Sequence, residues 1–121
     1  MRVWALKNLG LGEAAKRGVG TGSNQIPDMS AFSSGSDWFR LPGGQIVQTF
    51  SKMINGSDVN GTEVPFPIAF PQTLTALTAL WTDGSQTTAP TYKVMKHDKT
   101  SAYVKVSGGG VYGTLFIATG K

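Results

Sequence analysis

Apolar and polar residues alternate with a period of two along most of the chain after residue 36. This period places successive side chains on opposite faces of a β-strand, and short polar turns rich in Gly, Asn, Asp and Ser separate the apolar stretches. The predicted strands cover residues 37–41, 44–50, 62–70, 73–82, 89–96, 100–106 and 111–119. Seven short strands at this spacing indicate an all-β fold, either an antiparallel β-sandwich of about seven strands or a partly open barrel, and we take the sandwich.

The sequence Leu41-Pro42-Gly43-Gly44 predicts a hairpin turn between the first two strands. Pro42 fixes φ for the second turn position, and Gly43 can adopt the positive φ that a type II turn requires at the third.

Residues 64–70 combine strict alternation with two prolines. Val64, Phe66, Ile68 and Phe70 share one face of the predicted strand. The prolines lack the N–H group that a sheet ladder needs, so we place this strand at a sheet edge. The alternative is an extended apolar connection without ladder hydrogen bonds.

Two predicted strands, 73–82 and 111–119, are apolar on both faces. One face can fill the sandwich core, but the chain offers no further layer to cover the other. We therefore infer an oligomer interface, which a small core also favours. The alternative is that the threonines of these strands make the second face tolerant of solvent.

The first 36 residues differ from the rest. Trp4–Lys16 is the one plausible helix, although Gly10 and Gly12 weaken it. A tract rich in Gly, Ser, Thr and Asn follows to residue 36, as in an extended connector. We thus divide the chain into a helical or extended segment at 1–36 and a β-sandwich domain at 37–121.

Composition excludes several kinds of chemistry. The chain has no cysteine and one histidine, so it offers neither disulfides nor a His- or Cys-rich metal site, and we expect no metal and no cofactor. The seven carboxylates are scattered and fall mostly in turns, so we expect no catalytic pair and no enzyme activity. Gly108-Gly109-Gly110 is interpreted as a hairpin link because a strand, not a helix, follows it.

The charge and hydropathy of the chain also restrict its partners. The net charge of +4 is modest and is not concentrated in one section, which argues against nucleic acid as a partner. No apolar run is long enough to span a bilayer, so we expect no membrane insertion.

Three ordered blocks resemble the gp53-like C-terminal domain of phage and prophage tail fibres of the Mu-like and P2-like kind. They are Leu41-Pro42-Gly43-Gly44-Gln45-Ile46-Val47-Gln48, Val64-Pro65-Phe66-Pro67-Ile68-Ala69-Phe70-Pro71 and Gly113-Thr114-Leu115-Phe116-Ile117-Ala118-Thr119-Gly120. The segments 8–15 and 19–29 are similar to fibre-shaft sequence. Because Met1 stands within shaft-like sequence, we expect the chain to be part of a longer fibre.

The resemblance implies a homotrimer with an upstream fibre shaft at its N-terminal end and a tip that binds a bacterial surface polysaccharide such as lipopolysaccharide. It implies a virion tail location, with assembly in the cytoplasm of the bacterial host, and leaves open whether a fibre-assembly chaperone takes part. The alternatives are a structural module that trimerises and caps the shaft without receptor contact, and a glycan-degrading enzyme.

Candidate receptor-binding residues lie in or beside the loops at 51–61, 83–88 and 107–110. Since antiparallel strands alternate in direction, these loops should share one end of the sandwich, and those at 42–43, 71–72 and 97–99 the other. Amides and carboxylates suit sugar hydroxyls, and aromatic rings can stack on a sugar face. The predicted set is Asn55, Asp58, Asn60, Trp81, Asp83, Gln86 and Tyr112. The competing interpretation is that its polar members are solubilising turn residues.

Overall fold

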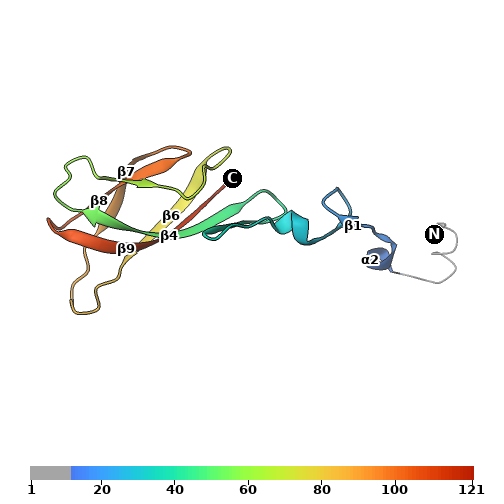
Figure 1. Cartoon of the computed structure of the whole chain (residues 1–121), viewed down its shortest axis with the longest axis horizontal. Coiled ribbons are helices and arrows are strands. Elements are labelled where there is room, and N and C mark those ends of the chain that lie inside the picture. Colours follow the sequence, from blue (N-terminus) through green and yellow to red (C-terminus); the bar gives the residue numbers. More distant parts are fainter. Residues whose placement is uncertain (1–11) are drawn as a thin grey trace.

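The computed structural model describes residues 12–121, which form an extended arm followed by a β-sandwich (Figure 1). No residue from 12 to 36 is buried. The arm contains a short helix, two short strands that pair in parallel and one 3-10 turn: α2 (Glu13–Lys16), β1 (Val19–Gly20), β2 (Ile26–Pro27) and η1 (Met29–Phe32).

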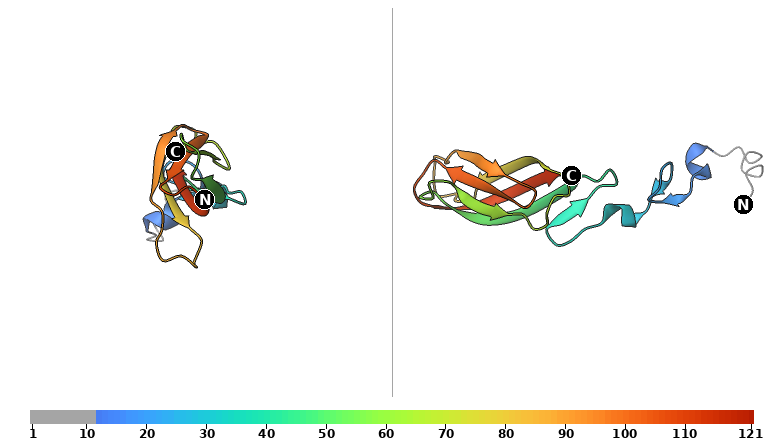
Figure 2. Two further views of the ribbon diagram at one scale, coloured as in Figure 1. Left: turned by 90° about the vertical axis from the view of Figure 1, so that its left-hand side faces the viewer. Right: turned by 90° about the horizontal axis from the view of Figure 1, so that it is seen from above.

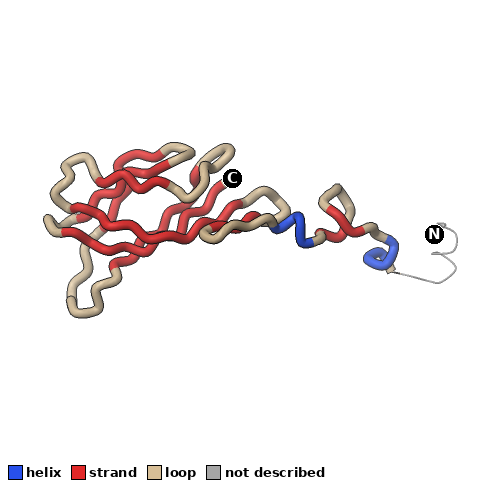
Figure 3. The backbone as a smooth tube through the Cα atoms, in the orientation of Figure 1, coloured by secondary structure: helices blue, strands red, loops and turns tan. Residues whose placement is uncertain are grey.

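Two antiparallel sheets form the sandwich (Figure 3). The four-stranded sheet has the order β3 (Trp38–Arg40), β4 (Ile46–Asn55), β9 (Val111–Gly120) and β6 (Leu74–Trp81). The three-stranded sheet has the order β5 (Thr62–Pro65), β8 (Ser101–Val106) and β7 (Tyr92–His97). The predicted all-β fold and the seven strands of the sandwich are therefore confirmed.

Several predicted boundaries were wrong. The second strand runs to Asn55 and not to residue 50, because β9 pairs with β4 along its whole length. The helix expected over Trp4–Lys16 begins only at Glu13 within the described residues, since Gly12 has an extended backbone; its first eight residues lie outside them.

The segment from residue 64 to 70 is a strand only in its first part. β5 ends at Pro65 and is an edge strand, as predicted, but from Phe66 onward the chain leaves the ladder. Its N–H groups still find acceptors: Phe66 donates to the Thr100 carbonyl (2.9 Å) and Phe70 to the Lys99 carbonyl (2.8 Å). The alternation of buried side chains therefore persists without a regular strand.

The hairpin between β3 and β4 uses a different glycine from the one predicted. The Gly44 N–H donates to the Leu41 carbonyl (2.9 Å), which closes the turn as expected. Gly44, not Gly43, has the positive φ, at 94°. A type II turn is thus excluded, because it would need the positive φ at Gly43.

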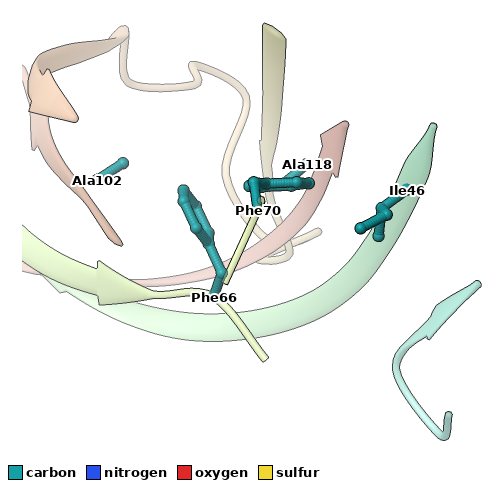
Figure 4. Close-up of a cluster of buried hydrophobic side chains, with 5 residues drawn as sticks. All are labelled: Ile46, Phe66, Phe70, Ala102 and Ala118. Atoms are coloured by element: carbon teal, nitrogen blue, oxygen red, sulfur yellow. The ribbon is translucent and has the colours of Figure 1, made fainter. Parts of the chain in front are cut away.

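The core lies between the two sheets in two adjoining clusters. In the first, Ile46 and Ala118 of the four-stranded sheet and Ala102 of the three-stranded sheet gather with the rings of Phe66 and Phe70 (Figure 4). The second contains Ile54, Val64, Val104, Val106 and Phe116. The Phe50 ring joins both clusters and stacks on Phe116, with the ring centroids 5.3 Å apart.

The two ends of the sandwich differ in their distance from the arm. β3 runs back toward the arm before β4 leads away from it, so the loops 56–61, 82–91 and 107–110 lie at the far end (Figure 2). We call this the tip end. The predicted sorting of loops is confirmed, and the chain returns to the arm side along β9 (Figure 1).

One outer surface of the sandwich is apolar. Phe116 and Ala118 of β9 are buried, whereas Leu115 and Ile117, which alternate with them, are 57% and 49% exposed. The outer patch on the four-stranded sheet consists of Met53, Leu80, Val111, Leu115 and Ile117. The predicted two-sided apolar character of β9 is confirmed. In β6 the outward positions carry Leu80 beside threonines, so that strand is apolar outside only in part.

Candidate functional site

The tip end brings together loops that are distant in the sequence. The Gly56 N–H donates to the Gly110 carbonyl (2.7 Å), which ties the loop after β4 to the loop before β9. The loop 82–91 connects the two sheets and projects away from the other two (Figures 1 and 2). The predicted site residues are therefore at one end of the molecule but in two separate groups.

Two of the predicted polar residues in the loop after β4 stabilise their own turn. The Asn55 amide oxygen accepts from the Ser57 N–H (3.1 Å) and hydroxyl (2.7 Å). Asp58 accepts from the Thr62 hydroxyl at 3.0 Å. These contacts use acceptors that a sugar would otherwise engage, although each side chain remains exposed.

Asp83 has the same kind of local role in the projecting loop. Its carboxylate accepts from the Ser85 hydroxyl (2.6 Å) and N–H (2.9 Å). The hydroxyl bond, and then the backbone bond, lower the pKa of Asp83 below its ordinary value. The carboxylate is therefore ionised and its loop is held in a turn.

Asn60 and Gln86 are the exposed members with no side-chain hydrogen bond in the described part of the chain. Their amides are free to meet a ligand from two different loops.

Trp81 and Tyr112 form an aromatic pair on adjacent strands. Their ring centroids are 5.2 Å apart and their planes are at 64°, an edge-to-face contact. Both side chains are half-buried at the tip end of the core. The contact fixes the orientation of the two rings relative to each other.

A cleft that sequence reasoning missed lies beside this pair. It has a volume of about 500 Å³ and is lined by Gly56, residues 91–93 and residues 105–109. Lys93 and Lys105 are direct partners in the β7–β8 ladder. The short turn at 97–99 indicates the hairpin, but the register shift between Val94 and Lys96 is what brings these two lysines opposite each other.

The described residues offer no other obvious centre. No group of three or more His, Cys, Asp or Glu side chains that could hold a metal ion occurs between residues 12 and 121. In the same part of the chain, no helix is long and apolar enough to cross a membrane.

Comparison with known families gives a match over most of this region. Residues 40–121 match the family described as "Putative tail fiber protein gp53-like, C-terminal". The chain belongs to this family. Membership of the gp53-like tail-fibre family indicates a virion tail component and confirms the resemblance drawn from the three sequence blocks. Comparison with curated protein sequences gives no match.

Solved structures of pyocin tail fibres share the fold of this gp53-like chain. The C-terminal part of the P. aeruginosa R2 pyocin fibre matches with a TM-score of 0.62 and 20% identity, over 74% of this chain and 25% of that one. An N-truncated R1-type pyocin tail fibre matches with a TM-score of 0.56 and 18% identity, over 100% of this chain and 97% of that one. The chain thus spans about a quarter of the R2 fibre fragment.

Proposed function

We propose that the chain is a homotrimeric, non-catalytic tip of a tail fibre, which binds a bacterial surface polysaccharide such as lipopolysaccharide during host adsorption. Residues 1–36 would continue an upstream shaft, and residues 37–121 would form the tip, assembled in the host cytoplasm. The known relatives are tail fibres, which supports a non-catalytic role.

The observation that carries this proposal is the position of the candidate residues. The arm leaves the sandwich at one end, and the loops bearing Asn60 and Gln86, with the Trp81–Tyr112 pair, lie at the other (Figure 2). In a fibre whose shaft continues the arm, this end faces the cell. Polar loops beside ordered aromatic rings are a common arrangement for sugar binding.

The apolar surfaces support the trimer. The outer patch would remain in water in an isolated chain, and such contiguous apolar surface is typical of protein interfaces. The arm also exposes apolar side chains to water, since Val19 is 64% exposed and Met29 is 82% exposed. Three chains side by side would cover both surfaces.

Adsorption of the purified full chain to host cells tests the proposal. Asn60→Ala combined with Gln86→Ala should weaken adsorption without lowering the melting temperature, because neither side chain holds a turn. Gln72→Ala is the matched control, since Gln72 is an exposed amide between β5 and β6, on the arm side.

Other outcomes would change the assignment. A trimer that binds no cells would favour the structural capping module. Release of reducing sugar or acetate from host polysaccharide would show an enzyme instead. Adsorption unaffected by the double variant would move the receptor site away from these loops.

A further inference from the structure

The lysine cleft at the tip end is a preformed basic site. Its walls are the first residues of β7, the last of β8 and the backbone of the glycine-rich loop that follows. Among residues 12–121, no carboxylate belongs to its lining. Any ligand that enters it therefore meets positive charge and backbone groups.

The two lysines face each other without a counter-charge. Lys93 and Lys105 occupy directly opposite positions on neighbouring antiparallel strands, where like charges are destabilising. Neither forms a salt bridge within residues 12–121. The acid on the next strand, Glu63, accepts a hydrogen bond from the Tyr103 hydroxyl (3.1 Å). An anion placed between the two ammonium groups would relieve their repulsion.

One of these cations is held in place. The Lys105 ammonium donates to the Gly56 carbonyl at 2.5 Å, and its side chain is half-buried. An ammonium has three N–H donors, so two of them remain for a ligand. Lys93 is exposed on the facing strand and makes no hydrogen bond with its side chain among the described residues.

We propose that this cleft binds the acidic group of a surface saccharide, a carboxylate or a phosphate ester, between Lys93 and Lys105. The inference rests on the proposed glycan-binding function and assigns its charged subsite. Ammonium groups bind both kinds of oxyanion through charge-assisted hydrogen bonds.

Titration of the ¹⁵N-labelled full chain with three sugars tests the subsite. Glucuronate supplies the carboxylate, glucose 1-phosphate the phosphate ester, and glucose is neutral. We expect one or both acidic sugars to shift the amide resonances of Lys93, Lys105 and Gly108, and glucose to leave them unchanged. The sugar that binds more tightly identifies the acidic group.

Two variants separate the cleft from the general positive charge of the protein. Lys93→Gln should weaken binding of the acidic sugar by about tenfold, the loss expected for one hydrogen bond between charged groups. Lys99→Gln makes the same change of charge in the turn at the opposite end and should have no effect. Equal weakening by both variants, or shifts spread over all the lysines, would overturn the proposal.

The outcome is distinct from that of the adsorption test. If the wild-type chain adsorbs to cells but no acidic sugar shifts the cleft amides, the charged subsite is wrong and the glycan-binding function stands. If the acidic sugars bind the cleft but the chain does not adsorb to cells, the subsite stands and the proposed function fails.

Discussion

The side-chain amide of Gln48 pairs with the backbone of Ile68 through two hydrogen bonds. Its nitrogen donates to the Ile68 carbonyl (2.8 Å), and its oxygen accepts from the Ile68 N–H (2.9 Å). Gln48 is fully buried on β4, and Ile68 lies in the segment that has left the β5 ladder. The glutamine thus replaces a neighbouring strand where Pro65 and Pro67 prevent a regular one.

Gln48→Leu should lower the free energy of unfolding by about 2–4 kcal/mol, because it leaves the N–H and the carbonyl of Ile68 without partners. Urea denaturation followed by tryptophan fluorescence measures the loss. Gln86→Leu, at an exposed position, should change stability by less than about 0.5 kcal/mol. Equal effects of the two changes would mean that the Gln48 pairing contributes no stability.

Leu115→Asp should dissociate the proposed trimer. The side chain lies in the middle of the outer patch, opposite Leu80 in the β6–β9 ladder, and a carboxylate there could not be buried between chains. Light scattering should give about three times the chain mass of 12.8 kDa for the parent and one chain mass for the variant.

Val59→Asp is the control for this experiment. Val59 is 81% exposed in the loop after β4, outside the outer patch, so its variant should remain a trimer. A monomeric parent protein would rule out the interface altogether.

Gly56→Ala should disturb the tip end. A Cβ atom at Gly56 would lie 1.9 Å from the Gly108 carbonyl oxygen, so the two loops would have to separate. We expect the free energy of unfolding to fall by about 1–3 kcal/mol, as at other overpacked sites. The NMR resonances of the backbone amides of residues 107–110 should also shift. Gly109→Ala should be nearly neutral, because nothing lies within 4 Å of its added carbon.

The ionisation of Asp98 makes the stability of the protein depend on pH in the acid range. Its carboxylate accepts from the Thr100 N–H (2.8 Å) and the Ser101 N–H (2.9 Å), and these bonds lower its pKa below the ordinary value. A lowered pKa in the folded state stabilises the protein above about pH 4 and loses that effect as the pH falls further. Asp98→Asn should therefore destabilise the protein at pH 7 and progressively less below pH 4. Denaturation curves at several pH values would show this, and a difference independent of pH would contradict it.

The alternation of apolar residues was sufficient to predict the strands, because burial of one sheet face imposes a period of two. It failed for the last residues of β4, where Ser51, Lys52 and Met53 are all exposed. That part of the strand exists because β9 pairs with it. Pairing with a distant strand leaves no local signal.

The candidate site was only partly accessible to sequence reasoning. Antiparallel strands alternate in direction, so every second loop lies at the same end of the sandwich. This rule was enough to place Trp81 and Tyr112 at the tip end, because each lies next to a predicted turn. The lysine cleft also depends on a register shift between Val94 and Lys96 and on the approach of Gly56 to the glycine-rich loop. Neither of these is encoded in a short stretch of sequence.

The place of β9 between β4 and β6 has a consequence for synthesis of the protein. β9 is the last of the four strands to leave the ribosome, yet both neighbours pair with it along most of their length. The four-stranded sheet, and with it the outer patch, therefore cannot form until β9 has been synthesised. Association of chains through this patch must accordingly follow the synthesis of β9.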